Sequence, residues 1–130
     1  MTNIRKVAAA TGDGRVTLLE EPVPDVKPGW VLVEVFNSLV SPGTEVGGWQ
    51  RFREKANNPD ARAEPSRFGY SNAGIVAEVG EGVNTVKPGD RVAAVGAGYA
   101  LHTDYALIPH NLCFVLPDNV SFSNGSYAML

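Results

Sequence analysis

The sequence contains a single cysteine, Cys113, among its 130 residues. Disulfide frameworks and cysteine-rich zinc sites need several thiols at fixed spacings, so one cysteine excludes both. A metal site would need carboxylates together with the two histidines, His102 and His110, and their spacing matches no familiar ligand pattern. We predict that one histidine is partly buried with a hydrogen bond and the other lies at the surface. Cys113 is expected to pack as a small core side chain.

Long apolar runs and clusters of positive charge are also missing. Stretches such as Trp30–Val35 are far shorter than the ~20 residues that cross a bilayer, and the N-terminus lacks an apolar signal core. Eleven Lys and Arg against 14 Asp and Glu give a net charge of −3, with no basic run to meet a phosphate backbone. We therefore expect a soluble, cytoplasmic protein that binds neither membrane nor nucleic acid.

Turn-forming residues, in contrast, are abundant, with 14 glycines and 9 prolines. The tetrapeptide Val-Lys-Pro-Gly occurs twice, at Val26–Gly29 and Val86–Gly89, and each copy runs into an apolar segment. Proline presets φ at the second turn position and glycine accepts the positive φ at the third, so both copies predict type II turns. The length suits one domain.

Short segments rich in β-branched and aromatic residues lie between the turns, which predicts a barrel or sandwich. Within Trp30–Ser38, the alternation places Val31, Val33 and Val35 on one side, toward the core. The expected strands are Ile4–Ala10, Val16–Glu20, Trp30–Ser38, Gly74–Val79, Arg91–Val95, Asp104–Ile108 and Leu112–Leu116.

Two helices are expected outside these strands. One is a short helix around Trp49, followed by a polar surface loop over Arg53–Glu64. The other begins near the end of the chain, where Ser121 is a candidate N-cap. Gly96-Ala97-Gly98 resembles the start of a dinucleotide-binding fingerprint, but position 101 is Leu and no helix is expected to follow. We therefore interpret it as a loop.

The segments Ser41–Glu45, Gly69–Gly74, Val79–Val83 and Pro88–Val92 follow one another in an order that resembles the medium-chain dehydrogenase/reductase superfamily. The resemblance is to its GroES-like catalytic domain and runs from about Lys6 to the end. It implies a mainly β fold, a GroES-like partly open β-barrel with short helices. It also implies one domain over residues 1–130, in which 121–130 starts the helix that leads to a Rossmann cofactor domain absent from this chain.

The chain departs from the zinc-dependent members of this superfamily. Those members have a Cys at the position of Ser41 and a His-Glu pair at the positions of Tyr70 and Ser71. Two hydroxyls and a phenol do not replace thiolate, imidazole and carboxylate as zinc ligands, because tyrosine ionises only near pH ~10. The structural zinc lobe needs four cysteines where this chain has only Gly96–Leu101. The resemblance therefore implies that no metal is bound, as in the zinc-free, quinone oxidoreductase-like branch.

The resemblance implies NAD(P)H as cofactor and hydride transfer to or from a carbonyl, an alcohol or an activated alkene. Without a metal, hydrogen-bond donors must stabilise the developing oxyanion, and the candidate catalytic residues are Ser41, Thr44, Tyr70 and His102. Tyr70 or His102 could donate a proton to that oxygen, and histidine ionises nearer to neutral pH. Alternatively, Tyr70 only fills the space of the missing metal. The resemblance leaves the role of Glu45 open.

Two function hypotheses follow from the resemblance. In the first, the chain is the substrate-side domain of a zinc-independent NAD(P)-dependent oxidoreductase. It binds a small-molecule substrate and is completed by a cofactor domain in the same or another chain. No residue of this chain is assigned to the cofactor, so the isolated chain is expected to be inactive. In the second, it is a non-catalytic GroES-like binding or assembly module. An apolar face without its covering domain favours a homo-oligomer in both cases.

Overall fold

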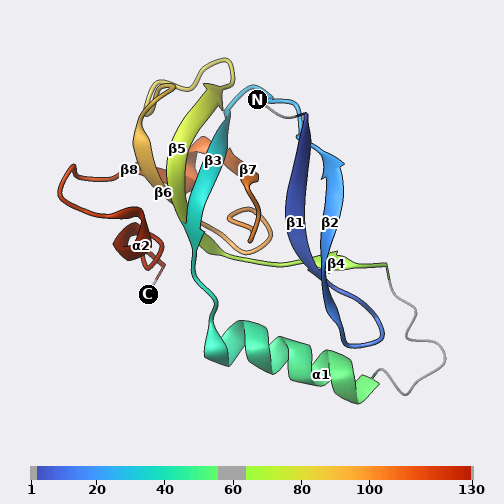
Figure 1. Ribbon diagram of the computed structural model, residues 1–130. Coiled ribbons are helices and arrows are strands. Elements are labelled where there is room, and N and C mark those ends of the chain that lie inside the picture. Colours follow the sequence, from blue (N-terminus) through green and yellow to red (C-terminus); the bar gives the residue numbers. More distant parts are fainter. Residues whose placement is uncertain (1–2, 56–63, 130) are drawn as a thin grey trace.

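Two antiparallel sheets and two short helices form the computed structural model, which describes residues 3–55 and 64–129 (Figure 1). The strands are β1 (Ile4–Ala10), β2 (Val16–Pro22), β3 (Trp30–Ser38), β4 (Ser66–Arg67), β5 (Ser71–Val79), β6 (Arg91–Val95), β7 (Tyr105–Pro109) and β8 (Cys113–Val115). The helices are α1 (Gly47–Lys55) and α2 (Phe122–Gly125), and single turns of other helix types cover Pro42–Val46 and His110–Leu112.

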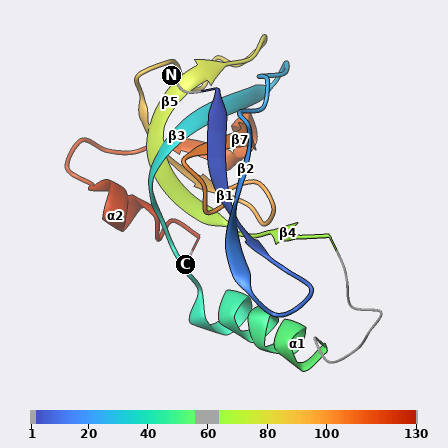
Figure 2. The same ribbon diagram turned by 45° about the vertical axis from the view of Figure 1, so that its right-hand side comes forward.

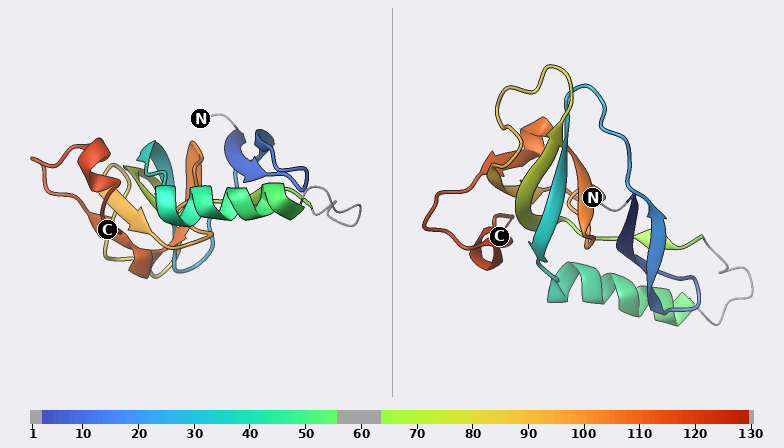
Figure 3. Two further views of the ribbon diagram at one scale, coloured as in Figure 1. Left: turned by 90° about the horizontal axis from the view of Figure 1, so that it is seen from below. Right: turned by 45° about the horizontal axis from the view of Figure 1, so that its top comes forward.

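The larger sheet has the strand order β7-β3-β5-β6-β8, and the smaller one has the order β2-β1-β4. The two lie side by side without closing into a barrel (Figure 2). Helix α1 runs from the end of β3 toward the β1–β2 hairpin, while α2 lies on the far side of the larger sheet (Figure 3). The predicted fold, mainly β and partly open with short helices, is confirmed.

The core of the larger sheet is built from small and β-branched side chains. Val31 and Val33 are fully buried, as predicted, and Val35 packs against them half-buried. Leu32, on the other face of the strand, is buried as well. The register of β3 against β5 shifts between Leu32 and Val33, where Ala77 is an extra residue in β5, and again between Val35 and Asn37, where Phe36 is an extra residue in β3. Cys113 belongs to the same core, as predicted.

Most strand predictions agree with the structure in place and differ at the ends. The segments β1, β3 and β6 match their predicted bounds, whereas β5 begins three residues earlier, at Ser71. Strand β8 is shorter than predicted because Leu112 ends a 3₁₀ turn. Strand β4 was not predicted, since two residues carry no alternation. The two expected turns are confirmed: Gly29 and Gly89 have φ of 80° and 90°.

Helix α1 is longer than predicted. It extends to Lys55, so the polar loop expected from Arg53 starts later, and most of that loop, residues 56–63, lies outside the described residues. Ser121 caps α2 as predicted, its Oγ accepting the backbone N–H of Asn124 at 3.0 Å. In the part of the chain that the structure describes, no helix has the length and apolar composition needed to span a membrane.

Candidate functional site

A groove of about 570 Å³ opens where the smaller sheet, the start of α1 and the segment before β5 meet. Of the predicted site residues, Thr44 and Tyr70 line this groove, and Glu45 lines it as well. Ser41 and His102 are not among the lining residues but are bonded to Glu45 behind it. Among the described residues, the lining is formed by Ala10, Val16, Val40, Thr44, Glu45, Val46, Gly48, Trp49, Ser66, Arg67, Phe68, Gly69, Tyr70, Ala97 and Gly98.

The turn Pro42–Val46 holds Glu45 in place through a pair of reciprocal hydrogen bonds. The Ser41 hydroxyl accepts the backbone N–H of Thr44 at 3.2 Å, and the Glu45 Oε2 atom accepts the backbone N–H of Ser41 at 2.8 Å. This is the logic of a capping box, stretched by one residue because the turn is wider than an α-helical one. The turn fixes both the backbone and the carboxylate at one corner of the groove.

Glu45 and His102 form a hydrogen-bonded pair that is almost fully buried. The His102 Nε2 atom lies 2.8 Å from Glu45 Oε1, and the two side chains are 10% and 7% exposed. The other ring nitrogen, Nδ1, lies 2.7 Å from the hydroxyl of Ser38, an exposed residue at the end of β3. A chain of polar atoms therefore leads from the surface at Ser38, through His102, to the Glu45 carboxylate in the groove.

No local pattern in the sequence indicates this pairing. Ser38, Glu45 and His102 come from three separate segments, and only His102 had been a candidate among the three. Neither Ser38 nor Glu45 had been assigned a catalytic role. Of the two histidines, His102 is partly buried and bonded, as predicted. His110 is half-buried and not exposed, which corrects the prediction of a surface histidine.

Two backbone hydrogen bonds fix the position of His102. Its N–H donates to the carbonyl of Phe68 at 3.1 Å, and its carbonyl accepts the N–H of Ala8 in β1 at 2.9 Å. Gly69 has φ of 133°, and a Cβ there would lie 2.5 Å from the His102 backbone nitrogen. Only glycine allows this close approach, so Gly69 is required for the packing of the His102 segment.

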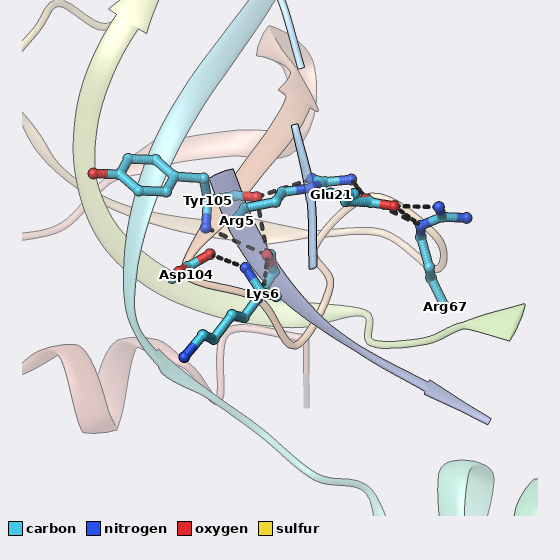
Figure 4. Close-up of polar contacts among 7 residues, drawn as sticks. Arg5, Lys6, Glu21, Arg67, Asp104 and Tyr105 are labelled. Atoms are coloured by element: carbon cyan, nitrogen blue, oxygen red, sulfur yellow. Dashed lines mark hydrogen bonds and ion pairs between the residues drawn. The ribbon is translucent and has the colours of Figure 1, made fainter. Parts of the chain in front are cut away.

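A polar network beyond His102 ties that segment to the smaller sheet (Figure 4). Arg5 in β1 donates to the carbonyl of Tyr105 at 2.9 Å, and the backbone N–H of Lys6 donates to Asp104 at 2.9 Å. Arg5 also pairs with Glu21 in β2, which pairs in turn with Arg67 in β4. Hydrogen bonds, first from Arg67 and then from Arg5, lower the pKa of the Glu21 carboxyl, although burial opposes them.

The residues at the zinc-ligand positions do not fit a zinc site. Ser71 is fully buried, and its hydroxyl donates to the Ser126 carbonyl at 2.6 Å, while Tyr70 offers a phenol. Burial raises the pKa of the Cys113 thiol to about 12, so it is no thiolate ligand at neutral pH. Over residues 3–55 and 64–129, no three His, Cys, Asp or Glu side chains gather as metal ligands.

The segment Gly96–Gly98 forms a loop, as predicted. Gly96 and Gly98 have φ of 123° and 80°, and the N–H of Tyr99 turns back to the carbonyl of Gly96 at 3.1 Å. Turns follow this loop where a dinucleotide fingerprint would continue into a helix.

Residues 27–128 match the model of the alcohol dehydrogenase GroES-like domain. The chain is 30% identical to a sorbitol dehydrogenase from Mus musculus over 88% of its length and 39% of that protein. It is 29% identical to a trans-enoyl reductase from Gibberella fujikuroi, covering 93% of the chain and 34% of the relative.

Solved structures give the same fold. A quinone oxidoreductase from Coxiella burnetii superposes with a TM-score of 0.74 at 19% identity, over 95% of this chain and 40% of that one. The chain thus spans between about a third and two fifths of the length of these relatives. With most of its length covered by the family model, the chain belongs to the alcohol dehydrogenase GroES-like domain family, in the medium-chain dehydrogenase/reductase superfamily of oxidoreductases.

Proposed function

We propose that the chain is the substrate-side domain of a zinc-independent NAD(P)-dependent oxidoreductase, which transfers a hydride to or from a carbonyl, an alcohol or an activated alkene. The observation that carries this proposal is the buried Glu45–His102 pair at the wall of a groove that Thr44 and Tyr70 also line. A nicotinamide supplies or accepts the hydride when bound. The residues of this chain then have to handle the charge and the proton on the substrate oxygen.

The side chains at the family's zinc-ligand positions support zinc independence. The family's ligand positions carry Ser41, Tyr70 and Ser71 here, and the hydroxyls of Ser41 and Ser71 are engaged within the protein. Oxygen donors without charge bind zinc poorly, so the charge on a substrate oxygen has to be met by hydrogen bonds. The groove-lining residues with hydroxyl groups suited to that role are Thr44, Tyr70 and Ser66.

The Glu45–His102 pair provides the proton. In its protonated form, the pair carries one proton more than a neutral imidazole beside a carboxylate. Glu45 passes this proton to the substrate oxygen, directly or through a groove hydroxyl. The pair then returns to imidazole and carboxylate. Ser38 lies at the other end of the chain of polar atoms and is exposed, so solvent restores the proton through it. His102 thereby acts through Glu45, since both of its ring nitrogens have partners.

The cofactor domain is part of the same proposal. The matched relatives are more than twice as long as this chain, and the Gly96–Gly98 loop does not lead into a phosphate-binding helix. We assign the nicotinamide to a Rossmann domain that follows residues 121–130 or is supplied by another chain.

The test measures NADH and NADPH oxidation by the full-length protein with a panel of aldehydes, ketones, quinones and enones. We expect turnover with at least one class, unchanged by 1,10-phenanthroline. Glu45→Gln keeps the shape and an acceptor for Ser41 but holds no titrating proton, so kcat should fall about 100-fold with KM changed little. Glu78→Gln, an exposed change on β5, is the control. Absence of turnover across the panel refutes the proposal, and loss of activity with the chelator refutes zinc independence.

A further inference from the structure

We infer that the groove binds an apolar carbonyl compound, such as an alkyl ketone, aldehyde or enone of medium chain length, in preference to a polyol. The choice of a carbonyl group rests on the proposed function. The choice of an apolar body rests on the lining of the groove. Its volume of about 570 Å³ lies within the usual range for small-molecule sites, about 300–1,000 Å³.

Apolar side chains from separate elements converge on the groove. Val16 at the start of β2, Val40 after β3 and Val46 before α1 are 54%, 57% and 37% exposed, and all three line it. Trp49 and Phe68 add aromatic surface to the same wall. Exposed apolar side chains that gather in one concave site mark a binding surface for an apolar partner. These side chains therefore favour a ligand with an apolar body.

The wall around Trp49 is fixed in position. The Trp49 Nε1 atom donates to the carbonyl of Gly14 at 2.9 Å, which ties α1 to the tip of the β1–β2 hairpin. Arg53 covers the indole ring, its guanidinium carbon 4.9 Å from the ring centroid. The indole therefore presents a firm apolar surface to a ligand and needs no rearrangement to do so.

Among the described residues, the two charged side chains of the lining, Glu45 and Arg67, already have protein partners. Each carboxylate oxygen of Glu45 already has one protein partner, Oε1 with His102 and Oε2 with the Ser41 N–H, so the carboxylate can serve one reacting oxygen but not a row of hydroxyls. The guanidinium of Arg67 is paired with Glu21. A polyol carries a hydroxyl on every carbon, and most of these would lose water against valine and tryptophan without gaining a partner. One carbonyl oxygen, in contrast, needs only one or two donors, such as the hydroxyls of Thr44 and Tyr70 in the lining.

The test is a binding measurement on the full-length protein without nicotinamide, by ligand-observed proton NMR titration. The probes are 2-butanone, 2-hexanone and 2-octanone, with sorbitol as the polyol. Each methylene that becomes buried should lower Kd by about two- to fourfold. Sorbitol should neither bind measurably nor displace 2-octanone. A Kd that does not change with chain length, or displacement by sorbitol, overturns the inference.

Two variants test whether 2-octanone binds in this groove. Val16→Asn and Val40→Asn place an amide in the groove from two different elements, and either should weaken 2-octanone binding by about fivefold or more while 2-butanone changes little. Leu18→Asn is the matched control, because Leu18 is on the same strand as Val16, is 64% exposed and lies outside the lining. Equal weakening by Leu18→Asn overturns the assignment to this groove. Length-dependent binding without nicotinamide oxidation supports the groove assignment and refutes the proposed reaction.

Discussion

At the scale of single residues, Gly74 shows how closely the strands of the larger sheet approach. A Cβ on Gly74 would lie 1.9 Å from the carbonyl oxygen of Glu34 in β3, which is backbone and cannot rotate away. Gly74→Ala should therefore lower the free energy of unfolding by about 3 kcal/mol, because β3 and β5 must separate. Gly43→Ala is the control, since its Cβ meets nothing within 4 Å. Chemical denaturation of both variants measures the difference, and equal stabilities would contradict the packing.

Residue-scale features differ in how far the sequence could predict them. The burial of Cys113 and the conformations of Gly29 and Gly89 follow from local chemistry, and each was predicted. The Glu45–His102 pair was not predicted, because the two residues are 57 positions apart and meet only in the folded chain, where hydrogen bonds to Ala8 of β1 and to Phe68 fix the backbone of His102. The sequence therefore predicted Thr44, Tyr70 and His102 as residues of the candidate site. It did not predict the path of polar atoms that joins Ser38, His102 and Glu45.

At the scale of elements, a hydrogen bond from Trp49 Nε1 to the Gly14 carbonyl ties α1 to the β1–β2 hairpin. Trp49→Phe removes the donor and keeps an aromatic ring, so we expect a loss of about 1 kcal/mol in unfolding free energy. Amide exchange at Gly14 and Arg15 should also become faster, because the hairpin tip opens more often. Trp30→Phe is the control, since Trp30 packs on Tyr99, away from this tip. Unchanged exchange in Trp49→Phe would show that the bond does not hold the hairpin.

The elements that the sequence predicted well are those with strong local patterns. Strands β1, β3 and β6 have enough β-branched or small apolar residues, between clear turns, to mark both ends. Strand β4 exists only because Ala9 and Ala10 of β1 offer a free edge to Ser66 and Arg67. Local composition carries no information about such an edge. The end of α1 was placed too early for a similar reason, since a polar stretch is equally typical of a loop and of an exposed helix.

At the scale of the whole molecule, the groove depends on how the smaller sheet sits against the segment before β7. Val7 of β1 bridges Thr103, and the Thr103 hydroxyl donates to the carbonyl of Lys6 at 2.8 Å. These contacts join residues almost 100 positions apart, so turn and strand patterns alone left barrel and sandwich equally open. The resemblance to a family supplied the arrangement that local physics could not.

The Arg5–Glu21–Arg67 cluster connects all three strands of the smaller sheet, and its charge makes that connection depend on pH (Figure 4). The pKa of Glu21 is lowered in the folded protein, so its stabilisation is complete above the ordinary value of 4.5 and is lost as the pH falls through the folded pKa. Glu21→Gln should cost about 2 kcal/mol of unfolding free energy at pH 7 and progressively less below pH about 4.

Denaturant unfolding of the wild type and Glu21→Gln from pH 7 to pH 3 measures this dependence. Glu20→Gln is the neighbouring control, because the Glu20 side chain is 68% exposed and its ion pair with Lys6 spans 4.0 Å, so its effect should stay within about 0.5 kcal/mol at every pH. The stability gap of Glu21→Gln should close on acidification because protonated glutamic acid and glutamine are then both neutral partners for the two arginines. A gap that stays constant down to pH 3 would mean that the side chain stabilises the sheet by packing alone and that its charge contributes nothing.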